Sequence, residues 1–178
     1  RDEQLVDHRL PADDVRQHVF WMFRFVNPGL FPNDPIADYF QSVAPPGFCA
    51  LYRLLAGCGI DPLLASKLIP FALGLLTAAY FFRAAFLLLR SAPVASLATI
   101  FFCQCLWLSS DLCSATPRAF FYSLFCAFLY YHVSNRRVAV VVCIFLQGLF
   151  FPPAALVSLG VLVLGLISWH RYPRLVRD

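Results

Sequence analysis

Residues 61–83 read DPLLASKLIPFALGLLTAAYFFR and carry the signal that decides the fold. Asp61 and Pro62 are a strong helix start, because Asp caps a helix N-terminus and Pro suits the first helical position. Apolar residues then run to Arg83 and are interrupted by the single charge of Lys67. Such a helix is about 33 Å long, enough to cross the roughly 30 Å hydrocarbon core of a bilayer. The stretch therefore predicts a membrane-spanning helix.

The composition of the whole chain agrees with this prediction. The 178 residues are 60% hydrophobic and 13% charged, with a mean hydropathy of +0.70, whereas a soluble domain is about 45–50% apolar. The net charge of +4 is dispersed, without the basic stripe interleaved with aromatics that binds nucleic acid. We therefore expect an integral membrane protein with membrane lipid, and not nucleic acid, as its surroundings.

Three further apolar segments follow the first. Residues 93–110 and 117–134 each open with a proline, and each is about 27 Å long as a helix. Residues 138–169 are too long for one simple crossing, and Pro152-Pro153 lies near their middle, which leaves either one kinked span or two short spans. With two, residues 62–178 form a transmembrane bundle with spans at about 62–83, 93–110, 117–134, 138–152 and 154–169.

The positions of the basic residues favour five spans, because arginine and lysine in short loops collect on the cytoplasmic side. A hairpin turning at Pro152 brings all the arginine clusters to one face of the membrane. These clusters are Arg83 and Arg90, Arg136 and Arg137, and Arg171, Arg174 and Arg177. The expected location is the bacterial plasma (inner) membrane, with the N-terminal segment on the periplasmic side.

Residues 1–61 hold eight of the ten acidic residues and no apolar run long enough to cross a bilayer. Helical spacing over residues 15–26 predicts an amphipathic helix that lies in the membrane interface. Its predicted membrane-facing side chains are Val19, Phe20, Trp21, Met22, Phe23 and Phe25. A second short helix is expected over residues 46–56. The predicted fold is therefore an all-α, polytopic membrane bundle preceded by an outer-face segment with two interfacial helices.

Asp13 and Asp14 stand at the start of the first of these predicted helices. His18 follows Asp14 by one helical turn and shares its face. A carboxylate in this setting can act as a general base toward an acceptor hydroxyl. The alternative is that one of the two aspartates merely caps the helix.

Three residues of the predicted bundle are also candidates for chemistry. Lys67 lies one turn inside the first span, where an unpaired ammonium is costly, so it needs a phosphate or carboxylate partner unless it reaches the interface. Arg118, at the outer end of the third span, suits a lipid-linked phosphate or, alternatively, ordinary headgroups. Asp111 is a second carboxylate. No metal site is predicted because ligand spacing is absent, and a divalent ion is left open.

The order of these features resembles the GT-C superfamily of membrane glycosyltransferases. In that family an acidic residue or pair opens the first outer loop. An interfacial helix, a Pro-Pro turn with a short helix, and a basic residue at the start of a span then follow. The corresponding segments are Asp13-Asp14, residues 15–26, Ala44-Pro45-Pro46-Gly47, residues 48–56, Lys67, residues 110–120 with Asp111 and Arg118, and Phe150-Phe151-Pro152-Pro153. The chain is also similar to cyanobacterial-type multi-spanning proteins with the patterns of residues 30–34 and 38–40.

The resemblance implies transfer of a sugar from a polyprenyl-phosphate donor to an acceptor at the outer face. Asp14 or Asp13 would be the catalytic base, and His18, Lys67, Asp111 and Arg118 would contact substrate. Ala44 stands where the family usually has His. The family's first and later spans have no counterpart in residues 1–178. We therefore expect an incomplete chain that is inactive alone. The alternatives are a non-enzymatic multi-pass protein, such as a transporter piece or assembly subunit, and a polymerase or ligase of lipid-linked glycans.

Overall fold

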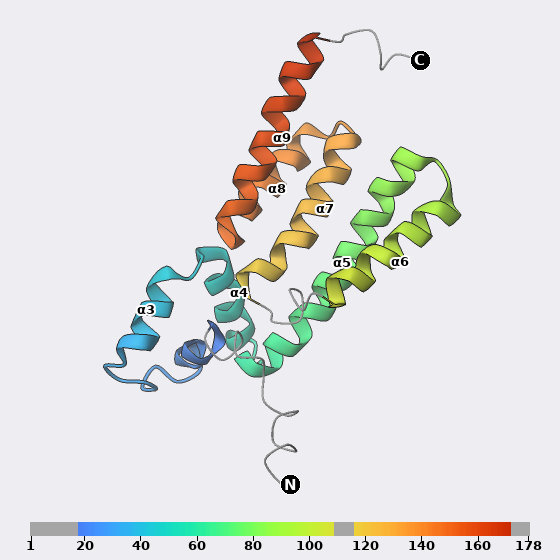
Figure 1. Ribbon diagram of the computed structural model, residues 1–178. Helices are drawn as coiled ribbons and strands as arrows, with labels where there is room; N and C mark the ends of the chain where they lie inside the picture. The colour runs from blue at the N-terminus through green and yellow to red at the C-terminus, as the bar shows by residue number, and fades with distance from the viewer. Residues whose placement is uncertain (1–17, 109–115, 172–178) are drawn as a thin grey trace.

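The computed structural model describes residues 18–108 and 116–171, and these residues form helices and connecting turns without a strand (Figure 1). The prediction of an all-α chain is confirmed for this part. The first helices pack together at one end of the molecule and are called the cap. They are η2 (Phe20–Phe25), α3 (Pro35–Val43) and α4 (Pro46–Gly57).

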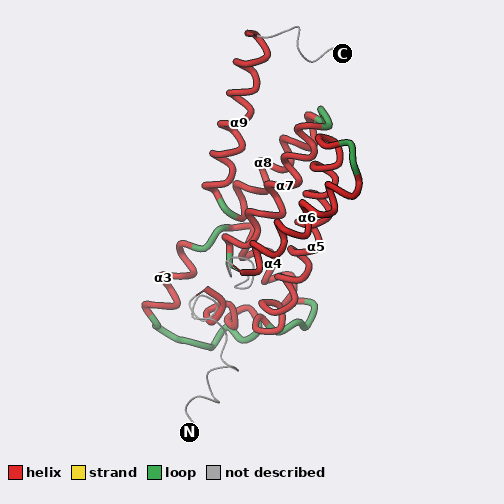
Figure 2. Tube along the Cα trace, turned by 45° about the vertical axis from the view of Figure 1, so that its right-hand side comes forward, coloured by secondary structure: helices red, strands yellow, loops and turns green. Residues whose placement is uncertain are grey.

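The remaining helices form a bundle that extends away from the cap. They are α5 (Pro62–Leu89), α6 (Ala92–Leu108), the short η3 (Pro117–Ala119), α7 (Phe120–Val133), α8 (Arg137–Phe150) and α9 (Pro152–Arg171). α7 packs against α5 on one side and α8 on the other, while α6 lies against α5 and α9 against α8 (Figures 1 and 2). Residues 138–169 thus form two helices that separate at Phe151, in keeping with a hairpin at Pro152.

Among the described helices, α5 is the one that is both long and apolar enough to cross a membrane. Its 28 residues correspond to about 42 Å. α6, α8 and the described part of α9 are apolar but shorter. A multi-pass arrangement therefore stays a prediction.

Aspartate followed by proline begins two of the helices by the same local chemistry. The carboxylate of Asp61 accepts a hydrogen bond of 2.7 Å from the backbone N–H of Leu63 at the start of α5. Asp34 does the same for α3, where Ile36 N–H donates to it over 2.9 Å. α3 was not expected from the sequence, although this Asp-Pro signal is the one that correctly marked α5.

Residues 15–17 of the predicted interfacial α-helix over residues 15–26 lie outside the described residues, and residues 18 and 19 are α-helical as predicted. Beyond them the prediction is wrong in helix type, and it is also wrong about which side chains are exposed. Residues 20–25 form a 3₁₀ helix. Val19, Trp21 and Met22 are 2%, 1% and 0% exposed, so they belong to the core of the cap and do not face headgroups. Helical periodicity identified an apolar face but could not show that α4 and the start of α5 cover it. Phe20, Phe23 and Phe25 are partly buried.

Hydroxyl groups fix the register of α5 and α7, which run parallel. Ser123 Oγ lies 2.9 Å from the carbonyl oxygen of Leu73 and 2.8 Å from Thr77 Oγ1. Thr77 Oγ1 also lies 2.7 Å from the Leu73 carbonyl oxygen. The two hydroxyl protons are therefore shared among three contacts, which join Thr77, Ser123 and the Leu73 carbonyl. Farther along the helices, the hydroxyls of Tyr80 and Tyr131 are 3.2 Å apart.

A close approach of helices joins the cap to the bundle. A Cβ placed on Gly47 of α4 would lie 2.9 Å from Leu149 Cβ and 3.0 Å from the Leu149 carbonyl oxygen. The ring of Phe120, at the start of α7, stacks on Phe150 with centroids 4.5 Å apart and meets Phe48 of α4 edge-on at 6.1 Å. The cap and the bundle therefore share one continuous core.

Gln147 on α8 is fully buried, and neither of its side-chain polar atoms has a hydrogen-bond partner. An unpaired buried amide is destabilising because it loses its hydration without compensation. We expect Gln147→Met to raise the free energy of unfolding by about 1–3 kcal/mol. The measurement is SDS titration in mixed micelles followed by circular dichroism. Gln104→Met, at an exposed position of α6, serves as a control, and a less stable Gln147→Met protein would contradict the prediction.

Candidate functional site

The first turns of α5 present Lys67 at the surface. Asp61 caps the helix and Pro62 is buried at its first position. Ala65 and Ser66 turn inward toward the cap, and the Ser66 hydroxyl donates to the Leu63 carbonyl over 2.8 Å. Because these neighbours take the inner face, the ammonium of Lys67 is left exposed.

A short 3₁₀ turn before α7 presents Arg118. The N–H of Ala119 donates to the Thr116 carbonyl over 3.0 Å and closes this turn. Ala119 is completely buried and Phe120 nearly so, whereas Arg118 between Pro117 and Ala119 is exposed. Burial of the two residues that follow therefore leaves the Arg118 side chain at the surface.

His18 is the first described residue and is partly buried in the cap. Its imidazole meets the ring of Phe40 of α3 edge-on, with the ring centroids 5.6 Å apart. The neighbouring Val19 is buried in the cap core. This packing orients the imidazole through α3.

The structure brings His18, Lys67 and Arg118 to the same end of the molecule. Each stands within two residues of a buried member of one core cluster. These members are Val19, Ala65 and Ala119, respectively. The parallel register of α5 and α7 agrees, because Lys67 lies six residues before Leu73 and Arg118 five before Ser123, distances of about 9 Å and 8 Å along the helices. Lys67 and Arg118 therefore lie at nearly the same distance along the helices from the contact between Leu73 and Ser123.

The predicted carboxylates of the site, Asp13, Asp14 and Asp111, lie outside the described residues. Residues 62–108 and 116–171 contain no aspartate or glutamate. No carboxylate of the described bundle helices can therefore neutralise Lys67 or Arg118. Each of these two exposed cations can bind a phosphate by charge-assisted hydrogen bonds.

The part of the chain that the structure describes holds no group of three or more histidine, cysteine or acidic side chains that could bind a metal ion. Burial raises the pKa of the Cys49 thiol in α4, which disfavours the thiolate that a nucleophile requires. Burial likewise raises the pKa of the Tyr52 phenol well above its ordinary value. Both side chains are suited to packing and not to acid–base chemistry.

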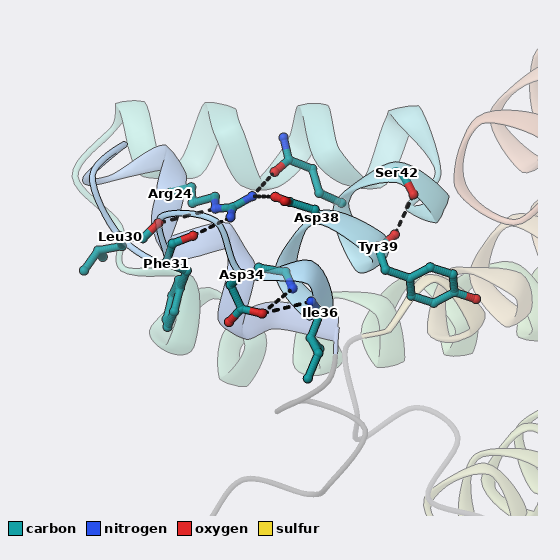
Figure 3. A network of polar contacts seen from close by, with 10 residues as sticks. Arg24, Leu30, Phe31, Asp34, Ile36, Asp38, Tyr39 and Ser42 are labelled. Atoms are coloured by element: carbon teal, nitrogen blue, oxygen red, sulfur yellow. Dashed lines mark hydrogen bonds and ion pairs between the residues drawn. The ribbon is translucent and has the colours of Figure 1, made fainter.

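Sequence reasoning missed an arginine network in the cap, shown in Figure 3. One Arg24 nitrogen donates to Asp38 over 2.7 Å and to Gln41 over 2.8 Å. The other terminal nitrogen donates to the Phe31 carbonyl over 2.6 Å, and Nε reaches the Leu30 carbonyl at 3.4 Å. An arginine within the apolar run of residues 19–26 was the available signal. These bonds fasten η2 to α3 and to the loop between them.

A shallow cavity of about 470 Å³ lies beside this network and includes Arg24, Asp38, Gln41 and Arg53 in its lining. The guanidinium carbon of Arg53 lies 5.0 Å from the centroid of the Phe25 ring, a cation–π contact. Lys67 and Arg118 do not line this cavity. The candidate site is therefore the end of the molecule that carries His18, Lys67 and Arg118. Comparisons with protein-family models, curated proteins and solved structures found no match to this chain.

Proposed function

We propose that α5 to α9 lie in the bacterial plasma membrane as a multi-pass bundle. Support comes from large apolar side chains that point away from the bundle. Leu75 on α5, Phe145 on α8 and Leu156 on α9 are 74%, 65% and 72% exposed. Lipid would remove the cost of such surface in water, about 25 cal/mol per Å². α8, at 14 residues, is about 21 Å long, a mismatch that local thinning of the bilayer accommodates.

The charges support an orientation with the cap on the periplasmic side. Arg90 follows the end of α5, Arg136 precedes α8 and Arg137 is the first residue of α8, so the three share the end opposite the cap (Figure 1). Arginines of short loops collect on the cytoplasmic side. The cap carries Asp34 and Asp38, Asp61 follows it at the start of α5, and this end would face outward.

We infer that the periplasmic end transfers a sugar from a polyprenyl-phosphate donor, as the resemblance to GT-C glycosyltransferases implies. The observation that supports this inference is that His18, Lys67 and Arg118 each stand within two residues of a member of one buried core cluster, namely Val19, Ala65 and Ala119. Lys67 and Arg118 would stabilise the phosphate that leaves when the anomeric C–O bond breaks. Asp14, or Asp13, would accept the proton of the attacking hydroxyl, and Asp111 would be a second substrate-binding carboxylate.

The test is binding of undecaprenyl phosphate to purified protein in detergent micelles. Lys67→Met and Arg118→Met are each expected to weaken binding by about tenfold, because each removes a charge-assisted contact to phosphate. The matched control is Arg90→Met, which removes one exposed positive charge from the opposite end. Equal binding by all four proteins would contradict the proposed site and would favour a non-enzymatic membrane protein.

A further inference from the structure

A groove of about 720 Å³ runs between α5 and α8 over the surface of α7, within the range of roughly 300–1,000 Å³ that is usual for ligand sites. α5 and α8 both pack on α7, so α7 forms its floor. Its walls include Leu76 of α5 and Val142 and Leu146 of α8, and Ala127 lies in the floor. From Val138 to Leu146 the groove follows α8 for about 12 Å. An apolar channel parallel to the helices matches the shape of an extended hydrocarbon chain.

One end of the groove is cationic. Arg136 and Arg137 line it at the turn between α7 and α8, and both are exposed. Arg83 on α5 lies one turn beyond Tyr80, which also lines the groove. Residues 62–108 and 116–171 contain no acidic side chain, so no carboxylate of these helices neutralises these guanidinium groups. The cationic end therefore complements an anion.

Two further features supply hydrogen-bond donors at this end. No side chain caps the N-terminus of α8 at Arg136, and the first N–H groups of a helix favour an anionic acceptor. The hydroxyls of Tyr80 and Tyr131 pair with each other, and a pair of hydroxyls uses one of its two protons internally. The second proton is available to a phosphate or ester oxygen.

We propose that this groove binds an anionic phospholipid of the cytoplasmic leaflet, with one acyl chain along α7 and the phosphate on Arg136 and Arg137. The proposal rests on the membrane placement given above and not on sugar transfer. The cationic end of the groove lies opposite the end that carries Lys67 and Arg118, and neither of these residues lines the groove, so it is separate from the candidate donor site. Basic pockets between membrane helices on the cytoplasmic side are suited to anionic headgroups.

The test is native mass spectrometry of the full chain released from detergent with phosphatidylglycerol or phosphatidylcholine. The wild-type protein is expected to retain phosphatidylglycerol about tenfold more tightly than phosphatidylcholine. Arg136→Gln/Arg137→Gln should remove this preference, because the charge-assisted contacts are lost. Arg53→Gln/Arg90→Gln loses the same charge elsewhere and should keep it.

Ala139→Phe tests the acyl-chain part without changing charge, since Ala139 lines the groove within one turn of Arg136. We expect it to weaken phosphatidylglycerol retention by about tenfold while the protein keeps its helical circular dichroism. Equal retention of the two lipids by wild-type protein, or unchanged retention by Ala139→Phe, would overturn the proposal. Displacement of the lipid by inorganic phosphate alone, or a dimer that Ala139→Phe disrupts, would also overturn it. Undecaprenyl phosphate binding should be unaffected by Ala139→Phe, so the two proposals fail separately.

Discussion

Asp14→Asn in the full-length protein is expected to reduce sugar transfer by a factor on the order of 10²–10⁴, the usual contribution of a general base. Asparagine has nearly the size of aspartate but cannot accept a proton from the acceptor hydroxyl. The measurement is the rate at which membranes containing the protein release polyprenyl phosphate from a panel of polyprenyl-phosphate sugars. The amount of protein in the membrane should be unchanged.

The same substitution separates catalysis from helix capping. Asparagine caps a helix N-terminus about as well as aspartate, so a capping residue would tolerate Asp14→Asn with unchanged turnover. Asp13→Asn is tested beside it, because the two aspartates are neighbours and either could be the base. Full activity of both variants would sink the proposed base, and loss in Asp13→Asn alone would move the role to Asp13.

Gly47→Val is expected to lower the free energy of unfolding by about 1–3 kcal/mol, the cost of forcing atoms into a packed interface. A Cβ at this position would meet both Cβ and the backbone oxygen of Leu149 at 3.0 Å or less. The backbone of α8 cannot move aside as a flexible side chain would, so α4 must shift away from the bundle. SDS titration in mixed micelles measures the loss.

Gly57→Val supplies the control on the same helix. A Cβ on Gly57 would have no neighbour within 4 Å, so the change in stability should be limited to the small helix-propensity difference between the two residues. If Gly47→Val and Gly57→Val unfold alike, the close contact between α4 and α8 does not fix the cap on the bundle. If Gly47→Val alone lowers the free energy of unfolding, it should also weaken undecaprenyl phosphate binding, because the cap core positions Lys67 and Arg118.

Local sequence signals identified most of the helices. Asp61-Pro62 begins α5, and Pro152 begins α9, because a fixed φ and a capping carboxylate act over neighbouring residues. α4 runs over Pro46–Gly57, close to the predicted residues 46–56. Asp34-Pro35 is the same kind of signal and begins α3, a helix that was not predicted.

For the candidate site, the sequence identified the residues, and the tertiary structure was needed to show where they lie. Residue types and spacing selected His18, Lys67 and Arg118 as charged or titratable groups beside apolar segments. The shared location of Lys67 and Arg118 depends on the parallel register of α5 and α7, which contacts between Ser123 and α5 fix across 46 to 50 residues of sequence. No local pattern encodes such a separation. Asp13, Asp14 and Asp111 lie outside the described residues, so their part in the site stays a prediction.

By itself, the sequence determined where several helices begin and that their faces are apolar, because capping, proline geometry and helical spacing act within a few residues. Tertiary structure decided which apolar faces are covered. Trp21 and Met22 lie in a core made with α4 and α5, whereas the equally apolar Leu75 remains exposed. The physical reason is that burial depends on which distant helix packs against a face, and several partners satisfy the same hydrophobic pattern.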